Sequence, residues 1–187
     1  VDTTSDGRRT SYTHSAAPHT YGDVGASLTA ESDEGEYGNA RYTLTVRAMD
    51  GICATAQDAE LNGDTVNLRV KLNGQVSVDP PDNILGSSSA TVRLQAGTTS
   101  WSEDVSAQLH EDPLVIDETI DIPYVIGSWT LLSGEAYVWA GSSDGLAHSA
   151  TARLTYEIMG AFDSTGAEVP IKEWMTQSGH TYGQDER

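Results

Sequence analysis

Hydrophobic and polar residues alternate along most of the chain, with a period of two residues. The alternation is clearest from Leu146 to Ile158, and it recurs at 24–30, 40–48, 66–78 and 90–96. This period is typical of a β-strand that has one side in a core and the other in water. The residues that we expect in the core from this pattern include Leu44, Val46, Leu68, Val70, Val92, Leu94, Leu154 and Ile158.

Short polar residues and glycines mark the expected turns. The run Asp163-Ser164-Thr165-Gly166 consists of residues that tolerate tight or left-handed backbone, and it predicts a turn. Asn73-Gly74 suits the two central positions of a type I′ turn, since both residues tolerate positive φ. We therefore predict a β-hairpin within residues 65–78.

Three further positions predict irregularities. Gly134 interrupts an apolar strand and indicates a bulge. Pro123 has no N–H for a sheet ladder and indicates an edge strand or a bend. Residues 49–62 lack a clear period, so we expect irregular structure there, with a weak alternative of a short helix within 54–60.

The expected fold is all-β: an antiparallel two-sheet β-sandwich of roughly nine or ten strands, with the jelly roll as one form of it. No helical period extends beyond two turns. We assign 19–183 to a single β-sandwich domain, 1–18 to an N-terminal arm and 184–187 to a C-terminal tail.

The N-terminal arm is polar, and Arg9 to Ser15 lacks apolar alternation, so by itself the sequence predicts a flexible arm. The alternative is an extended strand that another subunit accepts. If it adds to a neighbour's sheet, its anchoring side chains are Thr10, Tyr12 and His14, which share one side of an extended chain. Such head-to-tail strand addition generates a filament unless a ring closes. The competing donor is the more apolar segment Val169 to Met175.

Composition narrows the partners. The formal net charge is -18, and Lys71 and Lys172 are the only lysines, so we expect no nucleic-acid partner and no attraction to an anionic membrane. No run of eighteen apolar residues is present, so no membrane span is expected in this chain. Cys53 is the only cysteine, which excludes an internal disulfide and favours a buried, inert thiol.

Acidic clusters raise the question of calcium, which prefers six to eight oxygen ligands, often from loops. The candidate ligands are Asp58, Glu60, Asn62 and Asp64, which alternate within one loop but lack the order of an EF-hand. The alternative is a solvated acidic loop. The histidines His14, His19, His110, His148 and His180 are dispersed without ligand spacing, and we interpret His148 as a residue on the polar face of a strand.

Catalytic motifs are weak. Gly141-Ser142-Ser143-Asp144-Gly145 fits the G-x-S-x-G pattern, but a nucleophile elbow needs a helix after the serine and here a strand is expected. We therefore expect no enzyme and no cofactor other than the candidate calcium.

The tryptophans are candidates for sugar binding, since aromatic rings on a sheet face stack on sugars. They are Trp101, Trp129, Trp139 and Trp174. Tyr137 and Trp139 share one side of their strand, opposite Val138.

Several segments carry a resemblance to a known group. The chain contains Ser149-Ala150-Thr151-Ala152, the Asp163 to Gly166 turn and Ser178-Gly179-His180-Thr181-Tyr182. Together with the start at Tyr21 to Ala26 and the segment Ile122 to Gly127, these resemble secreted bacterial proteins that end in a PEP-CTERM sorting signal. The pattern departs from that group after Tyr182, where no Pro-Glu-Pro tail, apolar span or basic end follows.

The resemblance implies a bacterial protein that is extracellular or displayed at the cell surface, with a matrix or envelope role. The polar start at Val1 agrees with a mature, processed chain. Our leading expectation is a structural protein of a filament or biofilm matrix that associates with copies of itself by strand addition. The alternative is a carbohydrate-binding β-sandwich module, assisted by calcium, with an extracellular polysaccharide as its partner.

Overall fold

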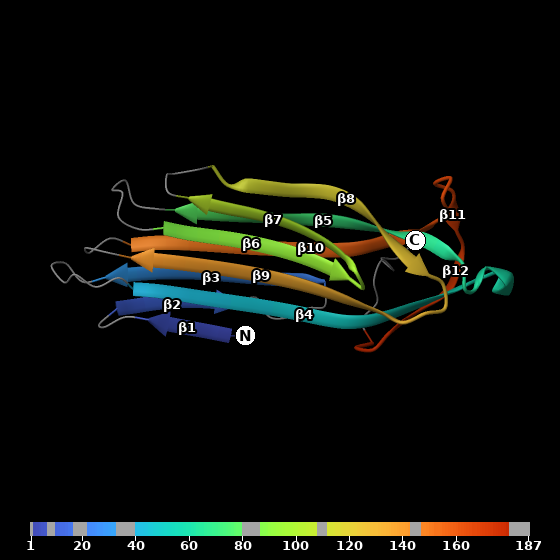
Figure 1. Cartoon of the computed structure of the whole chain (residues 1–187), viewed down its shortest axis with the longest axis horizontal. Helices are drawn as coiled ribbons and strands as arrows, with labels where there is room; N and C mark the ends of the chain where they lie inside the picture. The colour runs from blue at the N-terminus through green and yellow to red at the C-terminus, as the bar shows by residue number, and fades with distance from the viewer. Residues whose placement is uncertain are drawn as a thin grey trace.

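The computed structural model describes residues 2–6, 10–16, 22–32, 40–79, 87–107, 112–142 and 147–179. It contains two antiparallel six-stranded sheets that pack face to face, with their strands along the long axis of the molecule (Figure 1). Sheet A comprises β1 (Asp2–Asp6), β4 (Ala40–Ala56), β9 (Thr130–Ser142), β6 (Ser87–Ala96) and β7 (Thr99–Ala107) in that order, with β12 (Ile171–Thr176) also on β4. Sheet B comprises β2 (Thr10–Ala16), β3 (Asp23–Ser32), β10 (Ala147–Phe162), β5 (Thr65–Asp79) and β8 (Leu114–Val125), with β11 (Glu168–Val169) on β10.

The pairing order of the eight central strands is that of a jelly roll. The β6–β7 hairpin forms the innermost pair, and β5–β8, β4–β9 and β3–β10 pair antiparallel around it in succession. This nested set wraps into two sheets because β9 also pairs with β6, and β10 also pairs with β5. The expected antiparallel sandwich is confirmed. In this topology most connections between consecutive strands cross from one sheet to the other.

The core lies between the sheets and consists of the inward side of each alternating strand. All eight residues that the alternation places in the core are at most 3% exposed: Leu44, Val46, Leu68, Val70, Val92, Leu94, Leu154 and Ile158. Cys53 is also buried. Burial of this apolar surface is the main stabilising contribution, at roughly 25 cal/mol per Å².

The hairpin predicted at Asn73-Gly74 is wrong, because β5 continues through both residues as one strand of 15 residues. Gly74 lies opposite Leu154 of β10 and opposite Ile116 of β8. A Cβ atom on Gly74 would lie 2.2 Å from the carbonyl oxygen of Arg153. The glycine therefore permits a close approach of two backbones rather than a turn.

The bulge predicted at Gly134 is also wrong. β9 pairs with β4 and β6 in continuous register through this residue. A Cβ atom on Gly134 would lie 2.7 Å from Cε1 of Tyr156. The glycine makes room in the core for the tyrosine ring that the opposite sheet contributes.

Residues 49–62 are more regular than predicted, because β4 extends to Ala56 and only Ala59–Leu61 form a short 3-10 helix. Residues 50–54 are all buried, so both sides of the strand are covered and the polar alternation disappears. This three-residue helix is too short to cross a membrane, and the described residues contain no helix that is long and apolar enough to do so.

Both strands of the predicted N-terminal arm pair within their own chain. β1 pairs with β4 at the edge of sheet A, and β2 pairs with β3 at the edge of sheet B. The arm thus adds one edge strand to each sheet, and donation of these strands to a neighbour stays a prediction. The tail at 184–187 lies outside the described residues.

The C-terminal segment Val169 to Met175, the competing donor, also pairs within the chain, through β11 with β10 and through β12 with β4.

The turn predicted at Asp163 to Gly166 is confirmed: Gly166 N–H donates to the Asp163 carbonyl at 3.0 Å, and Gly166 has a φ of 86°. Hydrogen bonds from the Thr165 hydroxyl and from the N–H groups of Ala167 and Thr165 lower the pKa of the Asp163 carboxyl. After β12, Ser178 donates through its N–H and its hydroxyl to the buried Asp50 carboxylate, at 3.1 and 2.6 Å.

Two side chains form hydrogen bonds between the sheets, one in the interior and one between the edge strands β7 and β8. The hydroxyl of Tyr124 in β8 accepts from Ala54 N–H in β4 at 2.7 Å and donates to the Ser128 carbonyl at 2.8 Å. Burial raises the pKa of Tyr124 to about 12. The indole N–H of Trp101 in β7 donates to Glu118 in β8 at 3.1 Å, which joins the outer strands of the two sheets.

Candidate functional site: the outer face of sheet A

The central strand of sheet A presents two aromatic rings on the outside of the sandwich. In β9, Ala136, Val138 and Ala140 are fully buried. Because side chains alternate along a strand, Tyr137 and Trp139 point to the opposite side, where each is half-buried. The two residues are separated by about 7 Å along the strand.

We call Tyr137 and Trp139 the aromatic pair, and the residues on either side of it are small. Tyr137 lies in register between Thr45 of β4 and Thr91 of β6. Trp139 lies between Thr43 and Ser89 of the same two strands. Short hydroxyl side chains on both sides leave room above the rings and provide hydrogen-bond donors and acceptors beside them.

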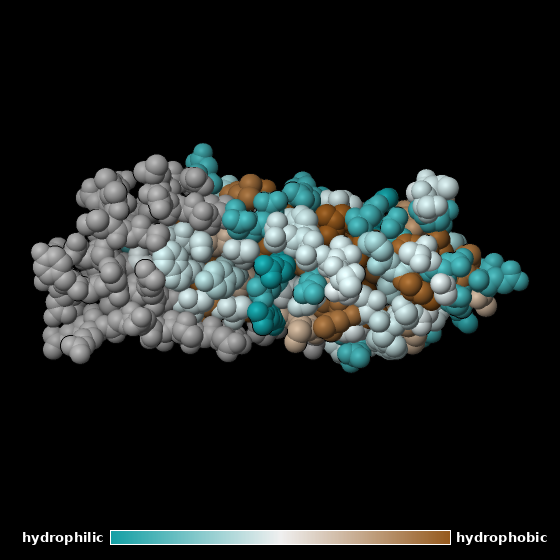
Figure 2. All heavy atoms as spheres, in the orientation of Figure 1, coloured by the Kyte–Doolittle hydropathy of each residue, from teal (hydrophilic) through white to brown (hydrophobic). Residues whose placement is uncertain are grey.

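A charged row crosses the same three strands next to the aromatic pair. Glu135 of β9 lies in register between Arg47 of β4 and Arg93 of β6. Arg47 forms an ion pair with Glu135, whereas Arg93 has no ion-pair partner within the part of the chain that the structure describes. We call these three residues the Arg–Glu–Arg row. Figure 2 shows this face, with hydrophilic side chains across the middle of the described surface.

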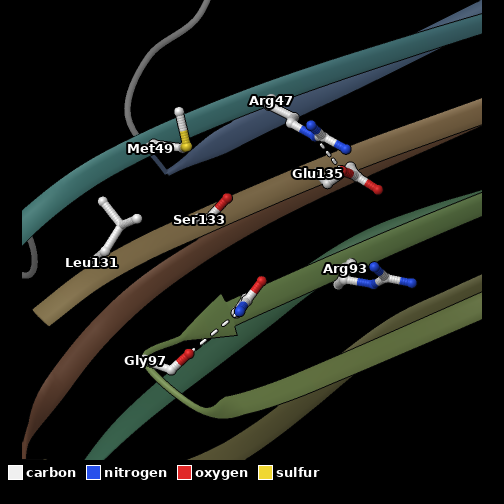
Figure 3. Close-up of a pocket in the computed structure, with 8 residues that line it drawn as sticks. Arg47, Met49, Arg93, Gly97, Leu131, Ser133 and Glu135 are labelled. Atoms are coloured by element: carbon white, nitrogen blue, oxygen red, sulfur yellow. Dashed lines mark hydrogen bonds and ion pairs between the residues drawn. The ribbon is translucent and has the colours of Figure 1, made fainter.

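Beyond the row, the face is hollowed. The depression has a volume of about 330 Å³ and is lined by Arg47, Met49, Arg93, Gln95, Gly97, Leu131, Ser133 and Glu135. Figure 3 shows Met49 and Leu131 at one end, and the Arg47–Glu135 pair opposite Arg93 at the other. Gln95 donates to the Gly97 carbonyl at 3.3 Å. The hollow therefore combines an apolar end with a charged end, as small-ligand sites generally do.

The predicted calcium ligands lie together in the β4–β5 connection, and two of them already accept hydrogen bonds from backbone N–H groups. Asp58 accepts from Glu60 N–H at 3.0 Å, and Asn62 accepts from Ala56 N–H at 3.2 Å. Glu60 and Asp64 are exposed in the same loop. Among the described residues, no group of three or more His, Cys, Asp or Glu side chains is arranged to hold a metal ion. Calcium at this loop stays a prediction.

The other candidates are spread over the molecule. The backbone at Thr10, Tyr12 and His14 belongs to β2, while their side chains lie outside the described part. Gly141 and Ser142 of the G-x-S-x-G segment belong to β9, and residues 143–146 lie outside the described part of the chain, which resumes with strand β10. The polar-face interpretation of His148 is wrong: the side chain is 1% exposed, on the same inward side of β10 as Ala150.

The four tryptophans do not form one surface. Trp101 and Trp174 are half-buried and pack against the core. Trp129 is 54% exposed in the connection before β9. Within the described ranges, Trp139 alone among the tryptophans has another aromatic residue beside it on an outer face, which reduces the predicted aromatic platform to the pair with Tyr137.

The sequence indicated the aromatic pair but missed the Arg–Glu–Arg row. Arg47, Arg93 and Glu135 each lie at an outward position of an alternating strand, so each looks like an ordinary solubilising residue. Their neighbourhood depends on the register of β4, β9 and β6, which the alternation within one strand does not determine. Comparison with known proteins adds no assignment: no protein-family model matches the chain, and a search of curated proteins finds no match.

Proposed function

We propose that this protein binds a carbohydrate on the outer face of sheet A. The observation that carries the proposal is the aromatic pair on β9, flanked by short hydroxyl residues and followed by the Arg–Glu–Arg row. Tyr and Trp combine a large rigid apolar surface with a polar group, which suits the apolar faces and hydroxyls of a sugar chain. The protein acts as a binding module, without catalysis.

The setting that we propose is extracellular or at the bacterial cell surface. The resemblance to PEP-CTERM proteins and the net charge of -18 both support this setting. The polysaccharide would then belong to the cell's own matrix or envelope.

A glycan-binding screen tests the proposal. The full chain is applied to immobilised plant, algal and bacterial polysaccharides, and retained polymers are titrated by calorimetry. Trp139→Ala and Tyr137→Ala should each weaken binding by about tenfold or more, since aromatic residues at the centre of a binding surface typically contribute at least this much. Trp129→Ala is the matched control, because it removes an exposed tryptophan that lies in the connection before β9, away from the aromatic pair.

The screen has a clear negative outcome. If no polysaccharide is retained, or if Trp129→Ala weakens binding as much as Trp139→Ala does, the aromatic pair is not a glycan site. Circular dichroism of each variant shows that loss of binding is not loss of fold.

A second proposal is self-association by strand exchange, and the arrangement of β1 and β2 favours it. One N-terminal segment supplies an edge strand to each sheet, on β4 and on β3. The same backbone hydrogen bonds can form with β4 and β3 of a neighbouring copy, which would link subunits head to tail. Val169 to Met175 is a weaker donor, because Ser178 attaches the end of this segment to Asp50.

Deletion of residues 1–17 tests strand exchange. The full chain should form concentration-dependent oligomers or filaments in size-exclusion chromatography and electron micrographs, and the truncated chain should not. A monodisperse monomer for the full chain at high concentration would contradict the proposal. Equal assembly of both chains would show that the arm is not the connector.

A further inference from the structure

At its charged end, the hollow contains Arg93, whose guanidinium forms no ion pair with the described residues. On the outer face of sheet B, the described cations are all engaged in ion pairs, namely Arg69–Asp121, Lys71–Asp117 and Arg153–Asp23. Arg93 has no such partner among the described residues, although acidic side chains outnumber basic ones by 28 to 10 in the chain. Among the four arginine side chains that the structure describes, Arg93 is therefore the one without a carboxylate partner.

The register explains why Glu135 does not neutralise Arg93. Arg47 and Arg93 lie on opposite sides of Glu135, and the carboxylate is bonded to Nε of Arg47. The row therefore has two positive charges and one negative charge. Its excess positive charge lies at Arg93, at the end of the hollow opposite Met49 and Leu131 (Figure 3). By register, Arg93 is two residues along β6 from Thr91, the neighbour of Tyr137.

We infer that the carbohydrate bound on this face is acidic, and that Arg93 pairs with its carboxylate or sulfate group. This inference rests on the proposed function. A guanidinium has five N–H donors in a planar fork that matches the two oxygens of a carboxylate or a sulfate. A sugar ring that stacks on Tyr137 would place a neighbouring acidic ring over Arg93, since Glu135 and Tyr137 are consecutive outward residues of β9.

The acidic surface of the protein does not prevent this contact. At physiological ionic strength the Debye length is about 8 Å, so distant carboxylates act weakly at Arg93 while a direct ion pair is little screened. The surrounding negative charge instead repels polyanions that find no contact at this face. Selectivity for the acidic ligand thus comes from one local positive charge.

The experiment uses two pairs of matched polymers with the full chain. Oligogalacturonate is compared with its methyl ester, which has the same sugar and linkage without the charge. Dextran sulfate is compared with dextran in the same way. Affinity is measured by calorimetry at constant ionic strength for the wild type, Arg93→Gln, Arg93→Lys and Arg153→Gln. The last variant is the control, because it removes the same charge from the outer face of sheet B.

The wild type should bind at least one charged polymer about tenfold more tightly than its neutral counterpart, as expected for a charge-assisted hydrogen-bonded pair. Arg93→Gln should abolish that preference, Arg93→Lys should retain part of it, and Arg153→Gln should leave it unchanged. Preference for galacturonate identifies a uronate ligand, and preference for dextran sulfate identifies a sulfated one.

Two results would overturn the inference, and they differ in what they say about the proposed function. If charged and neutral polymers bind equally and Arg93→Gln changes neither, the ligand is neutral and the aromatic pair alone remains as the site. If the wild type binds none of the four polymers and no polysaccharide in the wider screen, the glycan-binding function fails together with the inference.

Discussion

The two outer faces of the sandwich are built from the same kind of alternating strand, yet they use their outward residues differently. On sheet B, the central strand β10 exposes Thr, Arg, Glu and Met residues, and the described cations of the face are neutralised by neighbouring carboxylates. On sheet A, the central strand β9 exposes Leu131, Tyr137 and Trp139, and Arg93 is left without an ion pair among described residues.

The comparison teaches which outward residues the fold requires. Sheet B covers its outer face largely with polar residues and paired charges, together with the exposed aliphatic side chains Val115 and Met159 and the ring of Phe162 beneath Arg69. The aromatic pair and the unpaired Arg93 on sheet A go beyond that requirement. Half-exposed aromatic residues and Arg are also the residue types that are enriched at binding surfaces. The difference therefore assigns the binding role to sheet A in our proposal.

The largest expected effect separates the shared core from the outer face. Leu154→Ala on sheet B and Leu94→Ala on sheet A should each lower the free energy of unfolding by about 2–5 kcal/mol, since both side chains are at most 1% exposed. Trp139→Ala should lower it by much less, because that ring is only half-buried. Urea denaturation measures all three variants. If Trp139→Ala is as destabilising as Leu154→Ala, the ring serves the fold and the contrast between the faces disappears.

The central strands also differ on their inward side, because β10 contributes a histidine to the core whereas β9 contributes small and apolar residues there. His148 is 1% exposed, and neither ring nitrogen has a hydrogen-bond partner among the described atoms. Burial lowers the pKa of His148 in the folded state. The unfolded chain, with a histidine pKa near 6.5, therefore binds the proton more readily.

Acid should consequently destabilise the wild type through His148. Stability is retained above a pH of about 6.5 and is lost below it, by at most about 1.4 kcal/mol per pH unit. The variant His148→Leu should show a flatter profile between about pH 7.5 and 5.5 in chemical denaturation. The four other histidines are common to both proteins, so only the difference between the profiles is informative. Parallel profiles would show that His148 remains neutral or finds a partner.

The class of fold was predictable because burial on one side of a strand leaves a direct trace in the sequence. Leu44, Val46, Leu68 and Leu154 illustrate this, since each lies in an alternating segment and each is buried. Alternation failed where both sides of a strand are covered, as in residues 50–54 of β4. It was also overruled at Gly74, where a glycine that suits a turn serves the close approach of β10.

The candidate site was predictable only in part. The parity of Tyr137 and Trp139 relative to Val138 already placed the two rings on one side, but it did not say which side faced water. The Arg–Glu–Arg row was not predictable, because its three members are more than 40 residues apart in sequence and meet through strand register. A chemistry that depends on neighbouring strands becomes visible only when the topology is known.

A smaller effect concerns the ion pairs of sheet B. Arg69→Gln removes two hydrogen bonds to Asp121, of 2.9 and 3.1 Å, and should cause a small loss of unfolding free energy. Arg93→Gln should cause none that is measurable, since no described partner is lost. The hydrogen bond from Arg69 lowers the pKa of Asp121, so its stabilisation is present above the unfolded pKa of about 3.9 and is lost as the pH falls further. Equal losses for both variants at neutral pH would indicate that Arg93 is paired after all.

The smallest effect that we expect comes from salt, and it tests whether the ion pairs or the unbalanced charge dominates. With a net charge of -18, most carboxylates repel one another. A rise from about 0.01 to 0.15 M salt shortens the Debye length from about 30 to 8 Å and should raise the Tm, although it also weakens the ion pairs of sheet B. A Tm that falls with salt would mean that the pairs outweigh the repulsion.

Divalent ions refine this last test at the β4–β5 connection. Calcium and magnesium screen alike at equal ionic strength, so a larger rise of Tm with calcium indicates a specific site. The double variant Asp58→Asn/Asp64→Asn should then abolish the difference between the two ions, while Asp117→Asn on the outer face of sheet B should preserve it. Equal shifts with both ions in the wild type would leave screening as the sole effect. The oxygens of Asp58 and Asn62 would in that case serve only to hold the loop, through the backbone hydrogen bonds that they already accept.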